Sequence, residues 1–164
     1  MTPKAIIKRT ILFVGAVFAL SLITTSAVWA ACSDPAPKMG ATAPVKGVDW
    51  SGCDLSGVNL YDVFLYRANL EGANLTDANL ESANLYEANL TDADLAGANL
   101  TLTNLNGANL TGANLTGANL TKTKLMGANL TGADLTDAIL TEAIFHSATG
   151  PDGALCTQVV GACN

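Results

Sequence analysis

The chain has 164 residues, and its 8 Lys and Arg against 14 Asp and Glu give a formal net charge of −6. Without residues 1–30, which hold three of the basic residues, the balance is 8 − 3 = 5 basic against 14 acidic residues, or −9. Such a surface repels phosphate backbones, so direct nucleic-acid binding is not expected. The single histidine, His146, stands beside Ser147 without a third group to orient it. We therefore expect neither an enzyme nor a cofactor.

Residues 1–30 show the pattern of a secretory signal peptide. An apolar run over residues 11–23 follows a basic start made of Lys4, Lys8 and Arg9. Val28 and Ala30 occupy the positions of a cleavage site, which predicts cutting after Ala30 and export to the periplasm or beyond the cell. The run is shorter than the roughly 20 residues of a membrane span, so no span is expected after removal of the signal. An uncleaved anchor and lipidation of Cys32 remain alternatives.

Residues 31–47 follow the signal and contain three prolines, Pro35, Pro37 and Pro44. This composition predicts an irregular segment that caps the N-terminal end of the region after it.

Residues 48–147 repeat with a period of five. A large apolar residue stands at every fifth position from Trp50 to Phe145, and the 18 positions between these two are all Leu. A small residue, most often Ala, stands two positions earlier, and Asn or Asp fills 16 of the 20 positions in between. The unit reads A-N-L-x-x, as in Ala68-Asn69-Leu70-Glu71-Gly72. A fixed short repeat of this kind determines the architecture before any other feature does.

A period of five suits neither a helix nor one long strand. On a helix the leucines would wrap every side, and along a strand they would alternate between faces because five is odd. A short strand with Ala and Leu inward and Asn outward, followed by a turn, satisfies the pattern. Gly ends 9 of the 20 units, as a tight turn favours. The sequence thus predicts coils stacked as a β-solenoid, with columns of Asn forming hydrogen-bonded ladders.

Twenty consecutive A-[N/D]-L-x-x units over residues 48–147 resemble the pentapeptide-repeat family. The resemblance implies an all-β fold, a right-handed quadrilateral parallel β-helix with four units per coil. Twenty units would then make 20/4 = 5 coils. The family also includes DNA mimics that inhibit gyrase, a type II topoisomerase.

Residues 148–164 begin with the turn-like Gly150-Pro151-Asp152-Gly153 and are expected to form the C-terminal cap. The four cysteines lie near the two ends of the predicted solenoid: Cys32, Cys53, Cys156 and Cys163. Three pairings are possible, and we expect Cys32–Cys53 and Cys156–Cys163, each stapling one cap. A metal site is the rival interpretation, but the spacing matches no zinc pattern.

Positions twenty residues apart share a column if four units make a coil, and one face then departs from the repeat. We name each face after its first central residue, Trp50, Leu55, Leu60 or Leu65. The Leu65 face and its leading corner collect outward apolar and basic residues, which form a candidate partner surface: Phe64, Tyr66, Arg67, Tyr86, Lys122, Lys124, Met126 and Ile144. The alternative is that a cap segment or tail covers these residues.

The sequence therefore favours an exported, non-enzymatic scaffold that is structural or binds an unidentified protein. The runner-up is a DNA-mimic inhibitor of gyrase, which the acidity suggests and the export signal opposes. A minor alternative is an ice- or surface-binding solenoid, because flat rows of outward Thr and Asn could order water. Stacked Thr is also an ordinary feature of strands.

Overall fold

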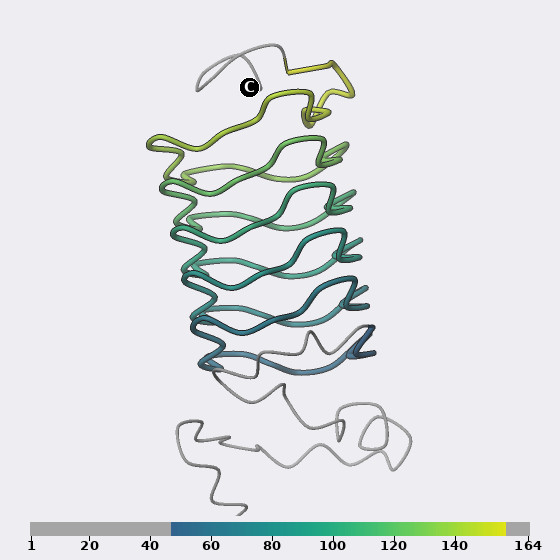
Figure 1. The fold of residues 1–164 in the computed structure, drawn as a ribbon, viewed down its shortest axis with the longest axis vertical. Coiled ribbons are helices and arrows are strands. Elements are labelled where there is room, and N and C mark those ends of the chain that lie inside the picture. The colour runs from purple at the N-terminus through teal and green to yellow at the C-terminus, as the bar shows by residue number, and fades with distance from the viewer. Residues whose placement is uncertain (1–46, 157–164) are drawn as a thin grey trace, which may run out of the picture.

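Parallel β-bridges with a spacing of twenty residues define the fold. The computed structural model describes residues Gly47–Cys156. Seventeen parallel bridges run from Asp49↔Asn69 to Asn129↔Thr149, and each joins a residue to the one twenty positions later. Four five-residue units therefore complete one coil, and the coils stack on one another as Figure 1 shows. The predicted β-solenoid is confirmed. At this spacing, the 100 residues of the predicted repeat region correspond to 100/20 = 5 coils.

The regular elements of the described chain are these single-residue bridges, with a turn after each. Backbone hydrogen bonds link the coils on both sides of a bridge, as from Leu70 N–H to the Asn89 carbonyl at 2.7 Å. Within Gly47–Cys156, no helix is long and apolar enough to cross a membrane.

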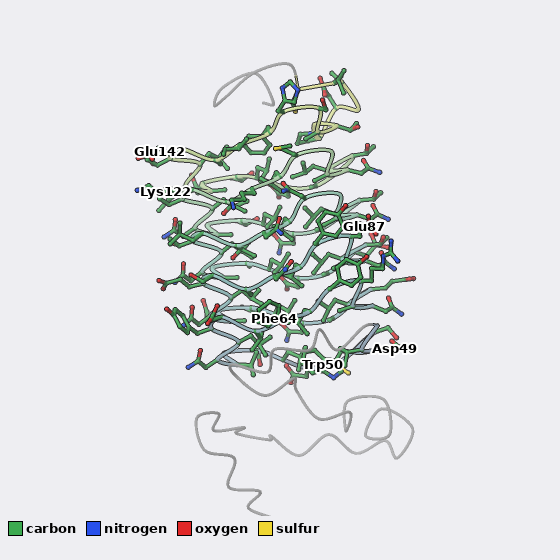
Figure 2. All side chains as sticks on the ribbon, viewed as in Figure 1. Asp49, Trp50, Phe64, Glu87, Lys122 and Glu142 are labelled. Atoms are coloured by element: carbon green, nitrogen blue, oxygen red, sulfur yellow. The ribbon has the colours of Figure 1, made fainter. Side chains whose placement is uncertain are left out.

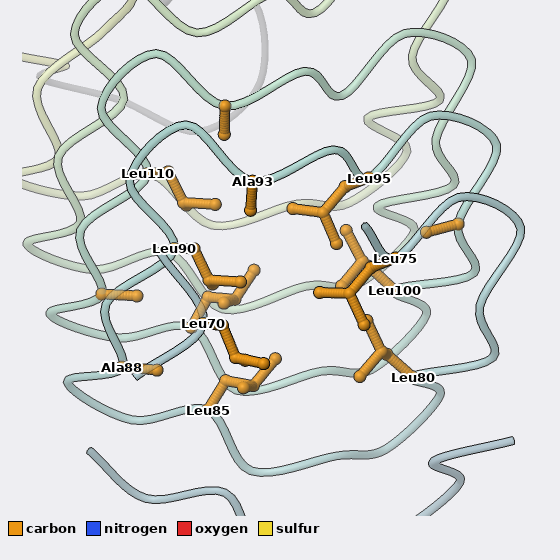
Figure 3. Packing of buried hydrophobic residues seen from close by; sticks show 14 of the residues in the cluster. Leu70, Leu75, Leu80, Leu85, Ala88, Leu90, Ala93, Leu95, Leu100 and Leu110 are labelled. Atoms are coloured by element: carbon orange, nitrogen blue, oxygen red, sulfur yellow. The ribbon is translucent and has the colours of Figure 1, made fainter. Parts of the chain in front are cut away.

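The interior is filled by the Leu and Ala positions of the repeat, as predicted. From Leu60 to Leu130 the central leucines are almost fully buried, and they stack in columns along the axis (Figure 3). Trp50 and Phe145 are buried in the first and last coils. Full burial of one Leu stabilises by about 1.5–3 kcal/mol, most of which is offset by ordering the chain. In the last coil, Leu135 and Leu140 are only partly buried.

Every unit ends in the left-handed backbone conformation. The last residue has a positive φ in all twenty units, nine of them Gly and eleven not. Glycine adopts this φ freely, whereas Leu102 at 61° and Lys122 at 58° each carry a strain of about 1–2 kcal/mol. The corner N–H donates to the next coil, as from Leu102 to the Thr121 carbonyl at 3.0 Å. The geometry of the coil therefore imposes the turn even where the sequence gives no glycine signal.

The outward Asn or Asp of each unit has two structural roles. Its Oδ1 accepts a hydrogen bond from the backbone N–H two residues later, as from Thr101 to Asn99 at 3.1 Å. An Asn also donates from Nδ2 to the side chain one coil earlier, as from Asn104 to Asn84 at 3.2 Å. The predicted Asn ladders are confirmed. Where Thr follows, its hydroxyl donates to the same Oδ1, as Thr101 does at 2.6 Å.

At the C-terminal end the chain turns back on itself. Thr149 forms an antiparallel bridge with Leu155, and Cys156 N–H donates to the Ala148 carbonyl at 2.7 Å. Neither Cys53 nor Cys156 is a free thiol. Their predicted partners, Cys32 and Cys163, lie outside the described residues, as do the predicted signal peptide, residues 31–46 of the N-terminal cap and residues 157–164 of the C-terminal cap. The pairing and the domain boundaries stay predictions.

Candidate functional site

The Leu65 face is one side of the solenoid. It comprises residues 63–67, 83–87, 103–107, 123–127 and 143–147, held in register by the bridges Phe64↔Asn84, Asn84↔Asn104, Asn104↔Lys124 and Lys124↔Ile144. Seven of the eight predicted surface residues belong to this face. The eighth, Lys122, lies at its leading corner, and Figure 2 shows it at the opposite edge of the solenoid from Glu87.

The predicted residues fall into two clusters. The lower cluster, in the first two coils, contains Phe64, Tyr66, Arg67 and Tyr86. The upper cluster, in the last two coils, contains Lys122, Lys124, Met126 and Ile144. On the face itself, the third coil separates them with the small residues Asn104, Asn106 and Gly107, and the exposed Leu102 stands at its leading corner. At about 4.8 Å per coil, three steps place the first and fourth coils roughly 14 Å apart.

The lower cluster is built around two stacked tyrosines. The rings of Tyr66 and Tyr86 are nearly parallel at 9°, with their centroids 5.5 Å apart. The Arg67 guanidinium carbon lies 4.9 Å from the centre of the Tyr66 ring, in a cation–π contact. Arg67 also forms an ion pair with Glu87. The twenty-residue register produces the ring stack and the ion pair, because it places each residue directly beside its counterpart one coil later.

The charges of the lower cluster shift one another's pKa values. The hydrogen bond from Arg67 holds the pKa of Glu87 below its usual value, and a hydrogen bond from Tyr86 lowers it further. The pKa of the Tyr86 hydroxyl is raised, chiefly by its hydrogen bond to Glu87 and then by the negative charge of that carboxylate. Glu87 stays ionised and Tyr86 stays neutral at neutral pH, so the cluster presents a neutral Tyr86 beside a compensated ion pair.

The upper cluster carries the free positive charge. Lys122 pairs with Glu142 at 3.7 Å, whereas Lys124 is exposed and has no ion-pair partner within the described residues. Met126 and Ile144 expose 47% and 37% of their surface. An ammonium group beside two exposed apolar side chains suits a partner that offers a carboxylate next to apolar groups.

The Leu65 face also lacks hydrogen bonds that the other faces make. In all sixteen units with Asn or Asp at the outward position, that side chain accepts the N–H two residues later. The four exceptions have Phe64, Lys124, Ile139 or Ile144 there, and three of these are on the Leu65 face. The repeat pattern identifies these outward residues, but the lost bonds are not predicted from it, although the absence of Asn or Asp signals each one.

Each exception leaves a backbone N–H without the acceptor that the repeat normally supplies. Met126 N–H donates to Asn106 Oδ1 in the coil before, at 2.9 Å. Tyr66 N–H and His146 N–H have no acceptor among residues 47–156. Unmade hydrogen bonds of this type each forgo about 0.5–1.5 kcal/mol. The Leu65 face therefore gives up this bond at two of its five coils, the first and the fifth, whereas the fourth coil replaces it.

Pentapeptide repeats match the chain over residues 45–77, 65–101, 93–132 and 118–149. Among solved structures, a pentapeptide repeat protein of the Arabidopsis thaliana thylakoid lumen is 45% identical, with 55% of this chain and 66% of that chain covered and a TM-score of 0.45. Rfr23 of the cyanobacterium Cyanothece 51142 is 37% identical, covering 58% and 85%, with a TM-score of 0.39.

HetL of the cyanobacterium Nostoc sp. strain PCC 7120, which is involved in regulating heterocyst differentiation, is 35% identical. It covers 66% of this chain, which spans 55% of HetL, and the TM-score is 0.32. No curated protein matches the chain. Because the matched repeats extend without a gap from residue 45 to residue 149, which is most of the chain, the protein belongs to the pentapeptide-repeat family.

Proposed function

We propose that this protein is a non-enzymatic, exported scaffold that binds a protein partner through its Leu65 face. One observation carries the proposal: three of the five units on this face give up the hydrogen bond of the repeat, against one of fifteen on the other faces. Of the three backbone N–H groups concerned, only Met126 N–H finds another acceptor among the described residues. Sequences that break their own structural rule in one place do so most often at functional sites.

The exposed groups support a protein as the partner. Aromatic rings, Met and Arg are enriched where proteins bind one another. The lower cluster offers the stacked rings of Tyr66 and Tyr86, and the upper cluster offers Met126 beside Lys124, which has no ion-pair partner among residues 47–156. The Tyr66 N–H adds a backbone donor that a partner's carbonyl group could accept.

We also propose that the solenoid supporting this surface is right-handed and four-sided, and that disulfides Cys32–Cys53 and Cys156–Cys163 staple its ends. Such bonds suit a protein that leaves the cytoplasm after cleavage at Ala30. Four free thiols in a titration of the native protein would reject the disulfides, and an intact N-terminus in the cytoplasm would reject export.

Capture of partners by two matched triple variants tests the binding surface. The first is Tyr66→Ser, Tyr86→Ser and Met126→Ser. The control is Tyr61→Ser, Glu81→Ser and Thr121→Ser, which alters the same position of the same coils on the Leu60 face. In pull-downs from the native compartment, the first variant should lose partners that the control retains, with unchanged β-type circular dichroism. Equal capture by both variants would overturn the proposal.

A second candidate function rests on the acidic Leu55 face. This face contains five aspartates and no basic residue: Asp54, Asp77, Asp94, Asp134 and Asp137. A row of carboxylates supports the alternative of a DNA mimic that inhibits gyrase. Purified protein should then inhibit DNA supercoiling by gyrase, and changing these five residues to Asn should abolish inhibition. No inhibition at high micromolar protein would remove this candidate.

The minor alternative, ice binding, receives less support. Except for Thr141, the outward Thr hydroxyls that would order water donate to Asn or Asp within their own unit, for example from Thr116 to Asn114 at 2.6 Å and from Thr121 to Asn119 at 2.6 Å. Their protons are therefore directed to the protein rather than to a surface water layer.

A further inference from the structure

Two of the three tyrosines, Tyr66 and Tyr86, are stacked on each other on the Leu65 face. The chain has three tyrosines, and two of them stack across neighbouring coils, with their ring centroids 5.5 Å apart and 9° between ring planes. Tyr86 exposes 37% of its surface and Tyr66 is half-buried. The third, Tyr61, is 41% exposed on the adjacent Leu60 face and has no aromatic partner within Gly47–Cys156.

We propose that Tyr66 and Tyr86 are a site of oxidative coupling, at which a one-electron oxidant joins the two rings covalently as dityrosine. Each phenol loses one electron and its hydroxyl proton, which gives two phenoxyl radicals. A carbon–carbon bond forms between the ring positions ortho to the two oxygens. The two ortho hydrogens then move to the oxygens and restore the phenols. Overall, two equivalents of oxidant accept two electrons and two protons are released.

The geometry favours coupling of this pair because the register holds the rings side by side before oxidation. Preorganisation of two reacting groups replaces a bimolecular encounter by a local rearrangement. Both side chains lie on the outside, so their rings can rotate toward one another without opening the Leu core.

The surrounding charges assign different roles to the two rings. Glu87 follows Tyr86 in the chain, and its carboxylate raises the pKa of the Tyr86 hydroxyl, so a base stands beside this ring that can accept the proton as the electron leaves. The Arg67 cation over the Tyr66 ring opposes removal of an electron from that ring. Tyr86 is therefore oxidised first, and Tyr66 follows. The product ties the first coil to the second on the Leu65 face.

The test uses the full-length chain, a ruthenium photosensitiser with light and persulfate, and peptide mass spectrometry. The folded monomer should yield a Tyr66–Tyr86 cross-link with the mass of two hydrogens lost, at least about ten-fold above any cross-link of Tyr61 within the same chain. Tyr61→Phe should leave the yield unchanged, whereas Tyr66→Phe or Tyr86→Phe should abolish it. Glu87→Gln should lower it.

Denaturation supplies the matched comparison. In an unfolded chain the shorter loop closes more readily, so Tyr61–Tyr66, five residues apart, should replace Tyr66–Tyr86, which are twenty apart. A folded chain that couples Tyr61 as efficiently as the stacked pair, or that forms only cross-links between molecules, would overturn the proposal. Neither outcome depends on whether the Leu65 face binds a protein partner.

Discussion

Lys124→Asn tests whether the Leu65 face has given up stability for binding. The substitution restores the repeat at this unit and removes the one cation of the surface without an ion-pair partner among the described residues. We expect a variant that is more stable than the natural chain and that captures its partner less well.

The hydrogen bonds of the neighbouring coil give the size of the stabilisation expected for Lys124→Asn. One coil earlier, Asn104 Nδ2 donates to Asn84 Oδ1 at 3.2 Å, and an Asn at position 124 would extend that ladder by donating to Asn104 Oδ1. Met126 N–H already has an acceptor in Asn106, so the gain is essentially this one bond. One hydrogen bond is worth about 0.5–1.5 kcal/mol, and the exposed Lys124 gives up little packing. The melting temperature should rise by roughly 2–6 °C.

Ile139→Asn is the matched variant on the Leu60 face. It gives Thr141 N–H and the Thr141 hydroxyl an acceptor, at the cost of a side chain that is already 50% exposed. It should also stabilise by about 1 kcal/mol, but leave partner capture unchanged. Thermal unfolding followed by circular dichroism and pull-down on the same preparations measure both quantities. A destabilised Lys124→Asn, or equal loss of capture in both variants, would refute the reasoning.

Three further outcomes test the account of the fold. Thr103→Val should lower the free energy of unfolding by about 1 kcal/mol, measured by denaturant titration, because the buried hydroxyl donates to the Leu80 carbonyl at 2.7 Å; an unchanged value would contradict this. Gly97→Ala should cost more than Gly117→Ala, since both have a φ near +66° but only the new Cβ at position 97 meets the Asp77 carboxylate; the difference should vanish in an Asp77→Ala background. Arg67→Met should raise the pKa of Glu87 toward its ordinary value of 4.5 in an NMR titration. Because the pKa is lowered in the folded chain, the stabilisation by Glu87 is present above pH 4.5 and is lost as pH falls through the lowered value. An unchanged pKa of Glu87 in the Arg67→Met variant would show that Arg67 is not its main partner.

The repeat predicts the fold because its five-residue period matches one short strand and one turn of the backbone. Leu70 and Ala68 recur at a spacing that only a coil of short strands can bury, and the twenty-residue bridges follow from four units to a coil. The column map made from the sequence therefore placed Phe64, Lys124 and Ile144 on one face, as the bridges confirm.

The sequence did not reveal the contacts within that face. The stack of Tyr66 on Tyr86 and the position of Arg67 depend on side-chain rotamers, which a period does not determine. The repeat predicts a corner at Leu102, but not its left-handed backbone conformation, because only the glycine positions indicate a positive φ by residue type. The backbone imposes that corner through the hydrogen bond from Leu102 N–H to the next coil.

The claim that the Leu65 face binds a protein partner is tested most directly by photo-crosslinking from two faces of the same coil. Benzoylphenylalanine replaces either Tyr86 on the Leu65 face or Glu81 on the Leu60 face, which occupy the same position of the second coil. After irradiation in the native compartment, position 86 should form a discrete cross-linked product with a protein partner, and position 81 should not. A partner cross-linked from position 81 and absent from position 86 would contradict the assignment of the Leu65 face as the binding surface.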